Sequence, residues 1–420
     1  MVFDAIIVGG GAAGFFTAIQ IATLRPTLKV LILERGKEVL TKVKISGGGR
    51  CNVTHAEFVP NELVKAYPRG EKELKGPFHA FCSGDTVAFF EERGVPLKIE
   101  EDGRMFPESD SSQSIIDCFL NETERLGVKI NTNCSVKSIT KTEQKGALWQ
   151  LKTQQGDFYC NYLAIATGSN PKMWNQLKML GHTIVSPVPS LFTFNIKDKR
   201  INGLMGVASP AEVKLFDKNH MSIKLEDGKK AMASGPLLIT HWGMSGPAIL
   251  KLSAWGAGEL HQLNYQFVIQ VNWLPQYDEE EILLVIEQAK TSEAKKIVFN
   301  TRPFDLPKRL WFKLLEASGI HQQQKWAEVG KQAIRKLIQE LTAAKFLVNG
   351  KSTFKEEFVT AGGIDLKEIN FKTYESKVCK NLFLAGEVLN IDAVTGGYNF
   401  QNAWTGGYVV AQAIAENTSI

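Results

Sequence analysis

The chain has 420 residues, of which 44% are hydrophobic and 22% charged, and its formal net charge is +5. This length exceeds the size at which one hydrophobic core stops growing, so we expect two or three globular domains and no extensive disorder. Lysine and arginine are dispersed along the sequence, which favours a solvated surface over a nucleic-acid footprint. A nucleic-acid partner is therefore not expected, although it stays open as an alternative, and the expected substrate is a small molecule.

The positions of the cysteines and of the apolar residues bear on metal binding, cellular compartment and membrane spans. The six cysteines form no C-x-x-C pair and have no metal-ligand spacing with the seven histidines, so we expect no metal site and a reduced, cytoplasmic protein. No run of about twenty uncharged apolar residues occurs, so we expect no membrane span. The oligomeric state is left open.

The segment from Phe3 to Glu34 combines an apolar strand, a glycine-rich turn, a helix and a second strand. Gly9 permits the tight strand-to-helix turn, Gly11 lets a pyrophosphate approach the backbone, and Gly14 allows helix and sheet to pack closely. Glu34, at the end of the second strand, can accept hydrogen bonds from a ribose diol. The pattern predicts a dinucleotide site.

An α/β rhythm continues to residue 186. We predict, in order, a long loop containing Lys44–Asn52, a helix at Asp85–Arg93, a hairpin region at Glu100–Pro107, a helix at Ser112–Leu126, strands at 128–130, 135–140, 148–153 and 156–160, and a buried strand at 162–166 that ends in Thr167-Gly168.

From about Pro187, apolar residues tend to alternate with polar ones, which is the spacing of β-strands. This predicts an inserted β-barrel-like domain over residues 187–276. Its expected strands are 191–196, 212–216, 222–225 and 265–271. Residues 277–347 carry apolar residues at spacings of three and four, which predicts a small helical domain. Its expected helices are 281–290, 307–318 and 326–346.

The α/β rhythm returns over residues 348–420. A buried-type strand at 381–385 ends in Gly386-Glu387, and the turn Thr395-Gly396-Gly397 leads into a helix at 400–415. We therefore expect an α/β fold with a Rossmann-like FAD-binding domain, formed by residues 1–186 and 348–420 and split by the β-barrel-like and helical insertion.

The C-terminal elements favour FAD over NAD. FAD enzymes of this architecture close the site with a C-terminal strand and Gly-Glu, and a helix starting at Gly396-Gly397 would stabilise an anionic reduced flavin. A simple glycine-rich turn is the alternative. Thr167-Gly168 is expected to approach the flavin nucleotide, and the main chain of Val136 the adenine, although Val136 also suits an ordinary strand position.

Five strings in the sequence resemble the BaiN/YhiN-type bacterial NAD(P)/FAD-dependent oxidoreductases, some of which are described as aminoacetone oxidases. They are G-G-G-A-A-G at 9–14, K-I-S-G-G-G-R-C-N at 44–52, T-H-W-G-M-S-G-P at 240–247, V-T-A-G-G at 359–363 and G-E-V-L-N-I-D-A-V-T-G-G-Y-N at 386–399. The similarity covers essentially the whole chain. It implies non-covalent FAD, a three-part architecture, and redox chemistry whose substrate varies across the family, from unsaturated steroid acids to amines.

From the motifs and the resemblance together we predict one set of FAD-binding residues. It comprises Gly9, Gly11, Ala12, Ala13, Gly14, Glu34, Arg35, Lys44, Ser46, Gly47, Gly48, Arg50, Cys51, Asn52, Val136, Thr167, Gly168, Gly386, Glu387, Asp392, Thr395, Gly396, Gly397, Tyr398 and Asn399.

Catalytic side chains are harder to read, because the cofactor carries the difficult step. A dithiol relay at Cys51 is not expected, since the position four residues later is His55 and not a second cysteine, and packing beside the cofactor is the simpler interpretation. His241 is a candidate proton donor, although its loop would equally serve to join two elements. Tyr398 is a second candidate, with aromatic packing as its alternative.

We expect a FAD-dependent oxidoreductase in which NAD(P)H, bound transiently, drives hydride transfer through flavin N5 to an activated C=C bond of a small organic substrate. An amine oxidase that uses O₂ is the enzymatic alternative. Two alternatives of other classes are an RNA-binding or RNA-modifying flavoprotein and a flavin-bound sensory protein without turnover.

Overall fold

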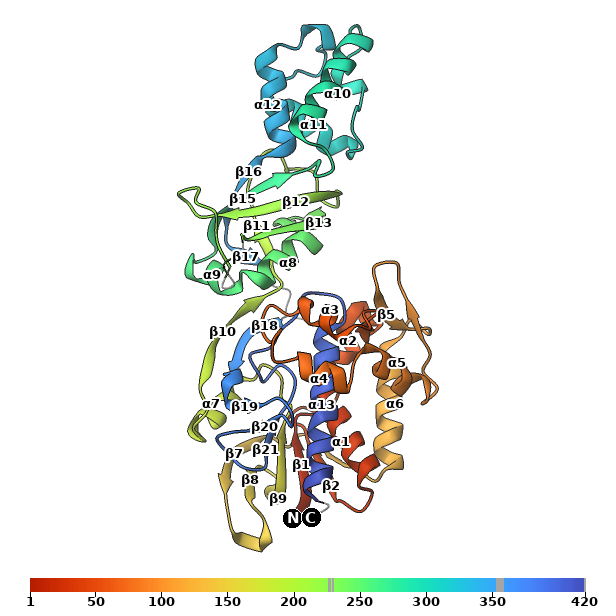
Figure 1. Ribbon diagram of the computed structural model, residues 1–420, viewed down its shortest axis with the longest axis vertical. Coiled ribbons are helices and arrows are strands. Elements are labelled where there is room, and N and C mark those ends of the chain that lie inside the picture. The colour runs from red at the N-terminus through yellow and green to blue at the C-terminus, as the bar shows by residue number, and fades with distance from the viewer. Residues whose placement is uncertain (226–227, 229, 353–358, 419–420) are drawn as a thin grey trace. The chain divides into compact units, whose positions relative to one another are not determined.

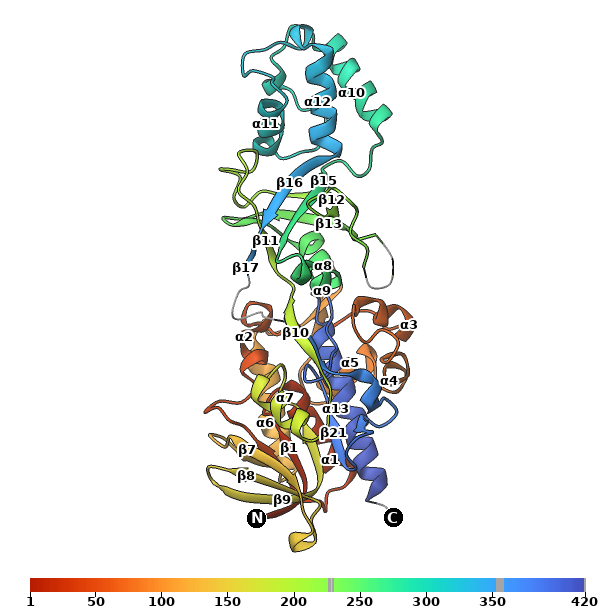
Figure 2. The same ribbon diagram turned by 90° about the vertical axis from the view of Figure 1, so that its left-hand side faces the viewer.

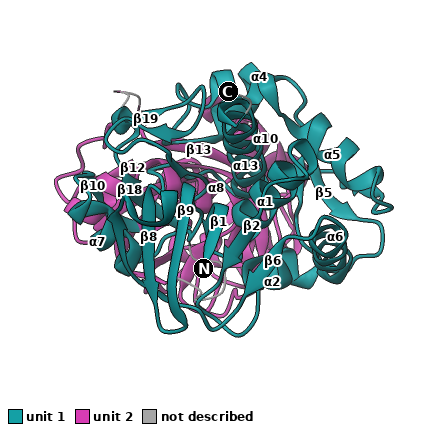
Figure 3. Ribbon diagram, turned by 90° about the horizontal axis from the view of Figure 1, so that it is seen from below, with its two compact units in different colours: residues 1–188, 359–420 teal, residues 189–358 magenta. Residues whose placement is uncertain are grey.

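The protein was analysed as a computed structural model, which describes residues 1–225, 228, 230–352 and 359–418. The chain divides into two compact units, shown in different colours in Figure 3. Unit 1 consists of Met1–Val188 and Val359–Ile420, and unit 2 of Pro189–Phe358.

Unit 1 is built on a mixed sheet of nine described strands in the order β19-β20-β21-β9-β1-β2-β6, with β7 and β8 attached beside β9. The central strands β21, β9, β1, β2 and β6 are parallel. Residues 5–8 of β1 and all of β2 are buried, as expected for parallel strands covered on both faces. Figure 2 shows β7, β8 and β9 side by side.

The strands of unit 1 are β1 (Val2–Val8), β2 (Val30–Leu33), β3 (Thr54–His55), β4 (Leu97–Ile99), β5 (Arg104–Pro107), β6 (Lys129–Asn131), β7 (Val136–Lys141), β8 (Trp149–Thr153), β9 (Gly156–Ile165), β10 (Ile184–Ser190, which reaches into unit 2), β18 (Val359–Ile364), β19 (Ile369–Asn370), β20 (Glu375–Ser376) and β21 (Leu382–Leu384). Its helices are α1 (Ala12–Leu24), α2 (Thr41–Gly49), α3 (Pro60–Leu63), α4 (Lys75–Ala80), α5 (Ser83–Glu91), α6 (Ser112–Arg125), α7 (Pro171–Met179) and α13 (Tyr398–Asn417), with short 3-10 turns at 64–66, 144–146 and 366–368.

Helices α1 and α13 come from opposite ends of the chain and lie side by side (Figures 1 and 3). A glycine makes this approach possible, because a Cβ added at Gly407 of α13 would lie 3.1 Å from the carbonyl oxygen of Ala13 in α1. The rings of Phe16 and Trp404 meet across the pair with centroids 5.6 Å apart. The N-terminal and C-terminal segments therefore share one core, which confirms the expected split Rossmann-like domain.

Unit 2 contains a sheet of seven described strands in the order β16-β15-β12-β13-β14-β11-β17. Residues 344–352 join both ends of this order, because β16 pairs with β15 and β17 pairs with β11. The sheet thus curls into a ring, in agreement with the expected barrel-like insertion. The strands are β11 (Thr193–Asn195), β12 (Ala208–Phe216), β13 (Met232–Ile239), β14 (Gly243–Ser245), β15 (Gln266–Asn272), β16 (Ala344–Asn349) and β17 (Lys351–Ser352).

The helices of unit 2 share a hydrophobic core with this sheet, so the insertion is one compact unit. At the junction the Trp273 amide donates to the carbonyl oxygen of Leu341 at 2.8 Å. Asp278 caps α10 through Glu281, in the reciprocal arrangement that satisfies two backbone donors. The helices are α8 (Pro247–Trp255), α9 (Ala257–Gln262), α10 (Glu279–Ser292), α11 (Lys308–Ala317) and α12 (Lys331–Thr342), with 3-10 turns at 298–300 and 326–328.

Four sequence-based expectations need correction. The helix expected over 326–346 is a 3-10 turn followed by α12, and residues 344–346 belong to β16, where pairing with β15 overrides the helical spacing. For the same reason unit 1 resumes at residue 359 and not at 348. Residues 222–225 form two isolated bridges and no strand. The loop expected at 44–52 begins as the end of α2.

Candidate functional site

The three glycines of the first turn have different surroundings. A Cβ added at Gly9, whose φ is +117°, would lie 2.3 Å from the carbonyl oxygen of Ala166, and one added at Gly14 would lie 1.9 Å from that of Gly9. A Cβ added at Gly11 would meet nothing within 4 Å. Gly9 and Gly14 are therefore required by the fold, whereas Gly11, at the N-terminus of α1, borders open space of the kind that a bound phosphate needs.

Glu34 is held at the carboxyl end of β2 by two backbone amides. The Gly10 N–H donates to its Oε2 at 2.8 Å, and the Gly36 N–H donates to its Oε1 at 2.7 Å. Each oxygen keeps a second lone pair, so the carboxylate is oriented and still able to accept from a ribose hydroxyl. Arg35, beside it, is exposed.

The ends of β9 and β21 meet the start of α1. A Cβ added at Gly386 would lie 3.3 Å from Cβ of Ala13, and one added at Gly168 would lie 3.6 Å from Oε2 of Glu387. Lys42 donates to the same oxygen of Glu387 at 2.5 Å. The structure thus brings together the strand ends that the sequence assigned to the cofactor, including Ala12 and Thr167 next to them in the chain.

The end of α2 carries three consecutive glycines in the left-handed region, with φ of 57° at Gly47, 69° at Gly48 and 86° at Gly49. Added Cβ atoms at Gly48 and Gly49 would meet nothing within 4 Å. Lys44 is exposed and lies 3.5 Å from Glu38, and the Ser46 hydroxyl donates to the Val43 carbonyl at 3.0 Å.

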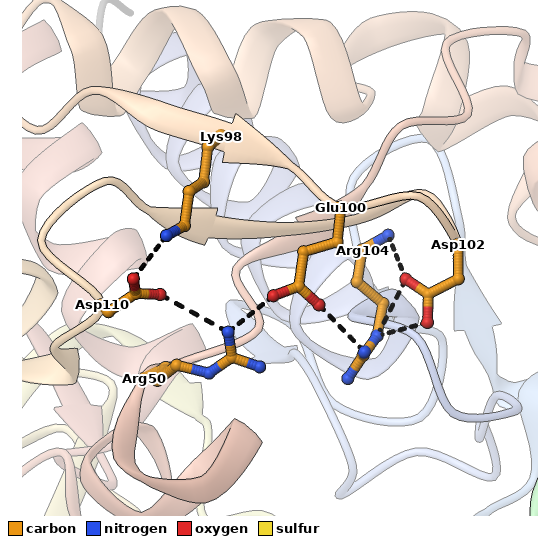
Figure 4. Close-up of polar contacts among 6 residues, drawn as sticks. All are labelled: Arg50, Lys98, Glu100, Asp102, Arg104 and Asp110. Atoms are coloured by element: carbon orange, nitrogen blue, oxygen red, sulfur yellow. Dashed lines mark hydrogen bonds and ion pairs between the residues drawn. The ribbon is translucent and has the colours of Figure 1, made fainter.

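Arg50 was expected to contact flavin or pyrophosphate, but its guanidinium has acidic partners within the protein. Nη1 lies 2.6 Å from Glu100 and 3.4 Å from Asp110, and the guanidinium carbon lies 3.9 Å from the centre of the Phe106 ring. Figure 4 shows the network, which Lys98, Asp102 and Arg104 extend. These contacts account for the Arg50 charge, and a direct cofactor contact stays a prediction.

The Gly396-Gly397 turn is tied to the segment that follows Cys51. In the amide orientation that satisfies both groups, Asn52 donates to the Thr54 carbonyl at 3.1 Å and accepts from the Gly397 N–H at 2.9 Å. His55 Nδ1 lies 3.1 Å from the Gly396 carbonyl oxygen. The glycines there have φ of 134° and 92°, so the turn depends on them. Thr395, which precedes them, is exposed.

Tyr398 begins α13 directly after this turn and stacks on His55, with ring centroids 4.5 Å apart. Burial, with the nearby charges of Glu57 and Asp102, raises the pKa of Tyr398 to about 12. Its hydroxyl therefore keeps its proton at neutral pH. His55 was noted in the sequence only as the position where a second cysteine is missing, because its partners lie more than 300 residues away in the chain.

Asp392 and Asn399 act within the loop before α13. The carboxylate of Asp392 is fully buried and is bound through both oxygens by Arg69, whose Nη2 donates to Oδ2 at 2.5 Å. The Asn399 amide bonds both backbone groups of Ala393, accepting at 3.0 Å and donating at 3.3 Å. The sequence assigned both residues to FAD, and the structure gives each of them a role in holding this loop. Arg69 was not singled out in the sequence.

Cys51 is buried and adopts a left-handed φ of 62°. Burial raises the pKa of its thiol to about 12, despite an opposing hydrogen bond with Ser46. The neutral thiol is the form that the fold favours, so this contribution to stability is complete below pH 9 and is lost as the pH rises towards 12. All six cysteines are free, and a neutral thiol is a poor redox nucleophile.

Two further predicted site residues belong to β7 and to unit 2. Val136 is at the start of β7, beside an irregularity in its pairing with β8. His241 is exposed in the turn between β13 and β14, where the Thr240 amide donates to the Gly243 carbonyl at 2.8 Å. Helix α8 starts at Pro247, with Gly246 as its cap. Because His241 belongs to unit 2, its catalytic role stays a prediction.

The residues present fit FAD. The open space at Gly11, Gly48 and Gly49 lies along backbone that a pyrophosphate or ring can approach. Oγ1 of Thr167 and both amide atoms of Asn402, in the second turn of α13, are buried and have no hydrogen-bond partner among the described residues. Buried polar atoms of this kind are normally satisfied, so a polar ligand is the simplest account of them.

A family model described as HI0933-like protein Rossmann domain matches residues 3–413. The chain belongs to this family. Family members are FAD-dependent oxidoreductases, so this protein is one as well. This confirms the resemblance on which the FAD assignment partly depended.

Several relatives match over almost their full length. Two are named ribosomal RNA dihydrouridine synthase: one from Haemophilus influenzae is 30% identical, covering 98% of each chain, and one from Escherichia coli is 29% identical, covering 98% of this chain and 97% of the relative. A third, from Clostridium scindens, is named 3-dehydro-bile acid delta(4,6)-reductase and is 28% identical, covering 98% of each chain.

Among solved structures, a 3-ketosteroid-delta4-(5alpha)-dehydrogenase from Rhodococcus jostii is similar, with a TM-score of 0.51, 12% identity, and 99% and 97% of the two chains covered. At this identity the likeness shows the fold alone. Among the described residues, no helix is long and apolar enough to cross a membrane, and no group of three or more His, Cys, Asp or Glu side chains is arranged to hold a metal ion.

Proposed function

We propose that this protein reduces the C5=C6 bond of a uridine in ribosomal RNA to give dihydrouridine, with NAD(P)H as the electron donor. The observation that carries the proposal is the similarity, over 98% of the chain, to two relatives named ribosomal RNA dihydrouridine synthase. The proposal keeps the activated C=C bond expected from the sequence and replaces the small-molecule substrate with an RNA base.

One reaction class links these relatives with the third one. The C5=C6 bond of uridine is conjugated to the C4 carbonyl, and the Δ4 bond of a 3-dehydro bile acid is conjugated to the C3 carbonyl. In both, hydride adds to the carbon remote from the carbonyl, and a proton then adds to the carbon next to it. The reactions for which these three relatives are named therefore belong to one class, the reduction of an alkene activated by a carbonyl group.

Bound FAD would supply the hydride for this reduction. The chain's own residues would bind the dinucleotide through Gly11 and Glu34 and surround the ring with the turn at Gly396-Gly397. Tyr398 would hold the proton for the second carbon at its hydroxyl oxygen, and His55, stacked on it, would fix the orientation of its ring. The raised pKa of Tyr398 keeps its hydroxyl protonated until the transfer.

A second candidate substrate is a small conjugated ketone of the steroid class. The 28% identity to the bile acid reductase over 98% of both chains favours it. Uridine in RNA and a steroid differ in charge, size and solubility, so one experiment separates the two.

The test is anaerobic. NADH or NADPH is added to the yellow protein, and we expect the flavin absorbance to bleach. An unmodified ribosomal RNA transcript is then added, and we expect the absorbance to return while mass spectrometry shows one uridine that has gained two hydrogens. Reoxidation by a conjugated 3-ketosteroid and not by RNA would establish the second candidate instead. Bleaching by a primary amine alone would contradict both.

Tyr398→Phe tests the proton donor. We expect the variant to bind FAD and bleach with NAD(P)H as the parent does, and the oxidation of its flavin by substrate to slow by about 100-fold or more. Because the pKa of Tyr398 is about 12, the substrate step of the parent protein should show no loss attributable to this residue between pH 6 and 10. Stopped-flow absorbance measures both steps, and an unchanged oxidation rate would exclude Tyr398 as the donor.

A further inference from the structure

The net positive charge of the chain is confined to unit 2. Unit 1 has 26 basic and 26 acidic residues, whereas unit 2 has 23 basic and 18 acidic residues, so the whole excess of +5 belongs to the insertion. Counted over the complete sequence, the basic residues look dispersed. Counted by unit, the basic and acidic residues balance in unit 1, so its formal net charge is zero.

Within unit 2 the excess is concentrated further. Residues 295–345, which contain α11 and α12, carry eleven Lys or Arg and four Asp or Glu, while the acidic residues Asp278 to Glu281 gather at the start of α10. The loop between α11 and α12 adds exposed polar side chains at His321, Gln322 and Gln323. Figure 2 shows α11 and α12 together at one end of unit 2.

Helix α12 carries three exposed basic residues outside its packed face. Ile334, Leu337 and Leu341 are buried in the core of unit 2. Lys331, Arg335 and Lys336 are exposed. With 3.6 residues per turn, Arg335 and Lys336 lie on the side opposite the packed face, and Lys331 lies at its flank. We call these three residues the α12 basic face.

Within the described part of the chain, no ion pair joins Lys331, Arg335 or Lys336 to an acidic side chain. Glu340, the acidic residue of this helix, lies 2.7 Å from Arg200. Like charges at i and i+4 repel, so positions 331 and 335 cost stability unless an anion neutralises them.

We propose that the α12 basic face binds the phosphate backbone of the RNA substrate. This inference rests on the proposed function, because it is an RNA substrate that offers a row of phosphates to three exposed cations. A polymer can be held by phosphate contacts on one unit while one of its bases reacts at another, which a free nucleotide cannot do. Contacts of this kind add affinity without reading sequence.

The experiment uses the full-length, FAD-loaded protein. The triple variant K331E/R335E/K336E is compared with K141E/K152E/K178E, a matched control in which three exposed lysines of neutral unit 1 undergo the same change of charge. The dissociation constant for an unmodified ribosomal RNA transcript is measured by filter retention over a series of salt concentrations. Flavin absorbance checks that each protein keeps its cofactor.

For the α12 variant we expect binding at least about 10-fold weaker, and a slope of log K against log salt that is smaller by about 2 to 3, since each phosphate contact contributes about 0.7 to 0.9. The control should retain most of the parent affinity, and its slope should stay close to that of the parent. In turnover, the α12 variant should raise KM for RNA with kcat little changed.

The outcomes separate this inference from the proposed function. An α12 variant that binds RNA as the parent does, while the parent forms dihydrouridine, overturns the inference and leaves the function standing. RNA binding that depends on the α12 basic face without any dihydrouridine formation supports the inference and contradicts the function. A parent protein that retains no RNA near physiological salt overturns the inference outright.

Discussion

Gly11→Asp is expected to give a folded, colourless protein. Gly11 is the N-cap of α1 with an extended backbone (φ −98°, ψ −168°) and no side-chain cap, and an added Cβ meets nothing within 4 Å. Aspartate is a favoured N-cap residue, so the cofactor-free protein should melt at the same temperature as the parent or slightly above it. A carboxylate about 4 Å from a phosphate, however, costs about 4 kcal/mol at an effective dielectric constant of 20, which weakens FAD binding about 1000-fold.

Two matched variants complete this test. Gly11→Ala places a neutral methyl group in the same space and should retain far more flavin than the aspartate variant. Gly14→Ala should instead reduce the yield of folded protein, because its Cβ would lie 1.9 Å from the Gly9 carbonyl oxygen. Titration with FAD and thermal melting of the cofactor-free proteins measure both effects. A yellow Gly11→Asp protein would show that the phosphates bind elsewhere.

Asp392→Ala is expected to destabilise unit 1 by about 3 to 5 kcal/mol, because it leaves the largely buried guanidinium of Arg69 without its carboxylate. The melting temperature should fall by roughly 10 °C. The loss should be equal in cofactor-free and FAD-saturated protein if the carboxylate serves only Arg69, and larger in the FAD-saturated protein if it also contacts the cofactor, as its motif predicted.

The control for this prediction is Glu100→Ala, which removes a partner from the half-exposed Arg50 network and should cost no more than about 1 kcal/mol. The double variant R69M/D392L replaces the buried ion pair with apolar side chains and should recover part of the lost stability. If Asp392→Ala and Glu100→Ala lower the free energy of unfolding equally, burial of the Arg69–Asp392 pair does not increase its contribution to stability.

The first βαβ unit could be predicted because its signals are local. Gly14 is required by its contact with Gly9 in the same turn, Gly9 itself has a φ of +117°, and the apolar runs of β1 and β2 have the composition of parallel strands. The strand at 344–349 was missed although its burial alternates strictly. Its sequence continues the helical spacing of α12, and pairing with β15, more than 70 residues earlier, decides its conformation.

The candidate site shows the same difference between features with local signals and features that depend on distant segments. Backbone features such as Gly9 and Gly396-Gly397 are visible in the sequence, because their positive φ favours glycine. Side-chain partners are not, since the acids that engage Arg50 and the carbonyl that meets His55 come from distant segments. Counting charge over the whole chain likewise concealed the basic excess of unit 2, which appears only when the unit boundaries are known.

The chain leaves unit 1 through β10 and returns through β18, and these two strands pair with each other. The approach is close, since a Cβ added at Gly362 would lie 2.6 Å from Cα of Pro187. The ends of the inserted segment are thus neighbours, and a short hairpin turn would suffice to reconnect them. In topological terms the insertion could be replaced without interrupting the cofactor-binding unit, because its two ends leave and enter that unit at one place.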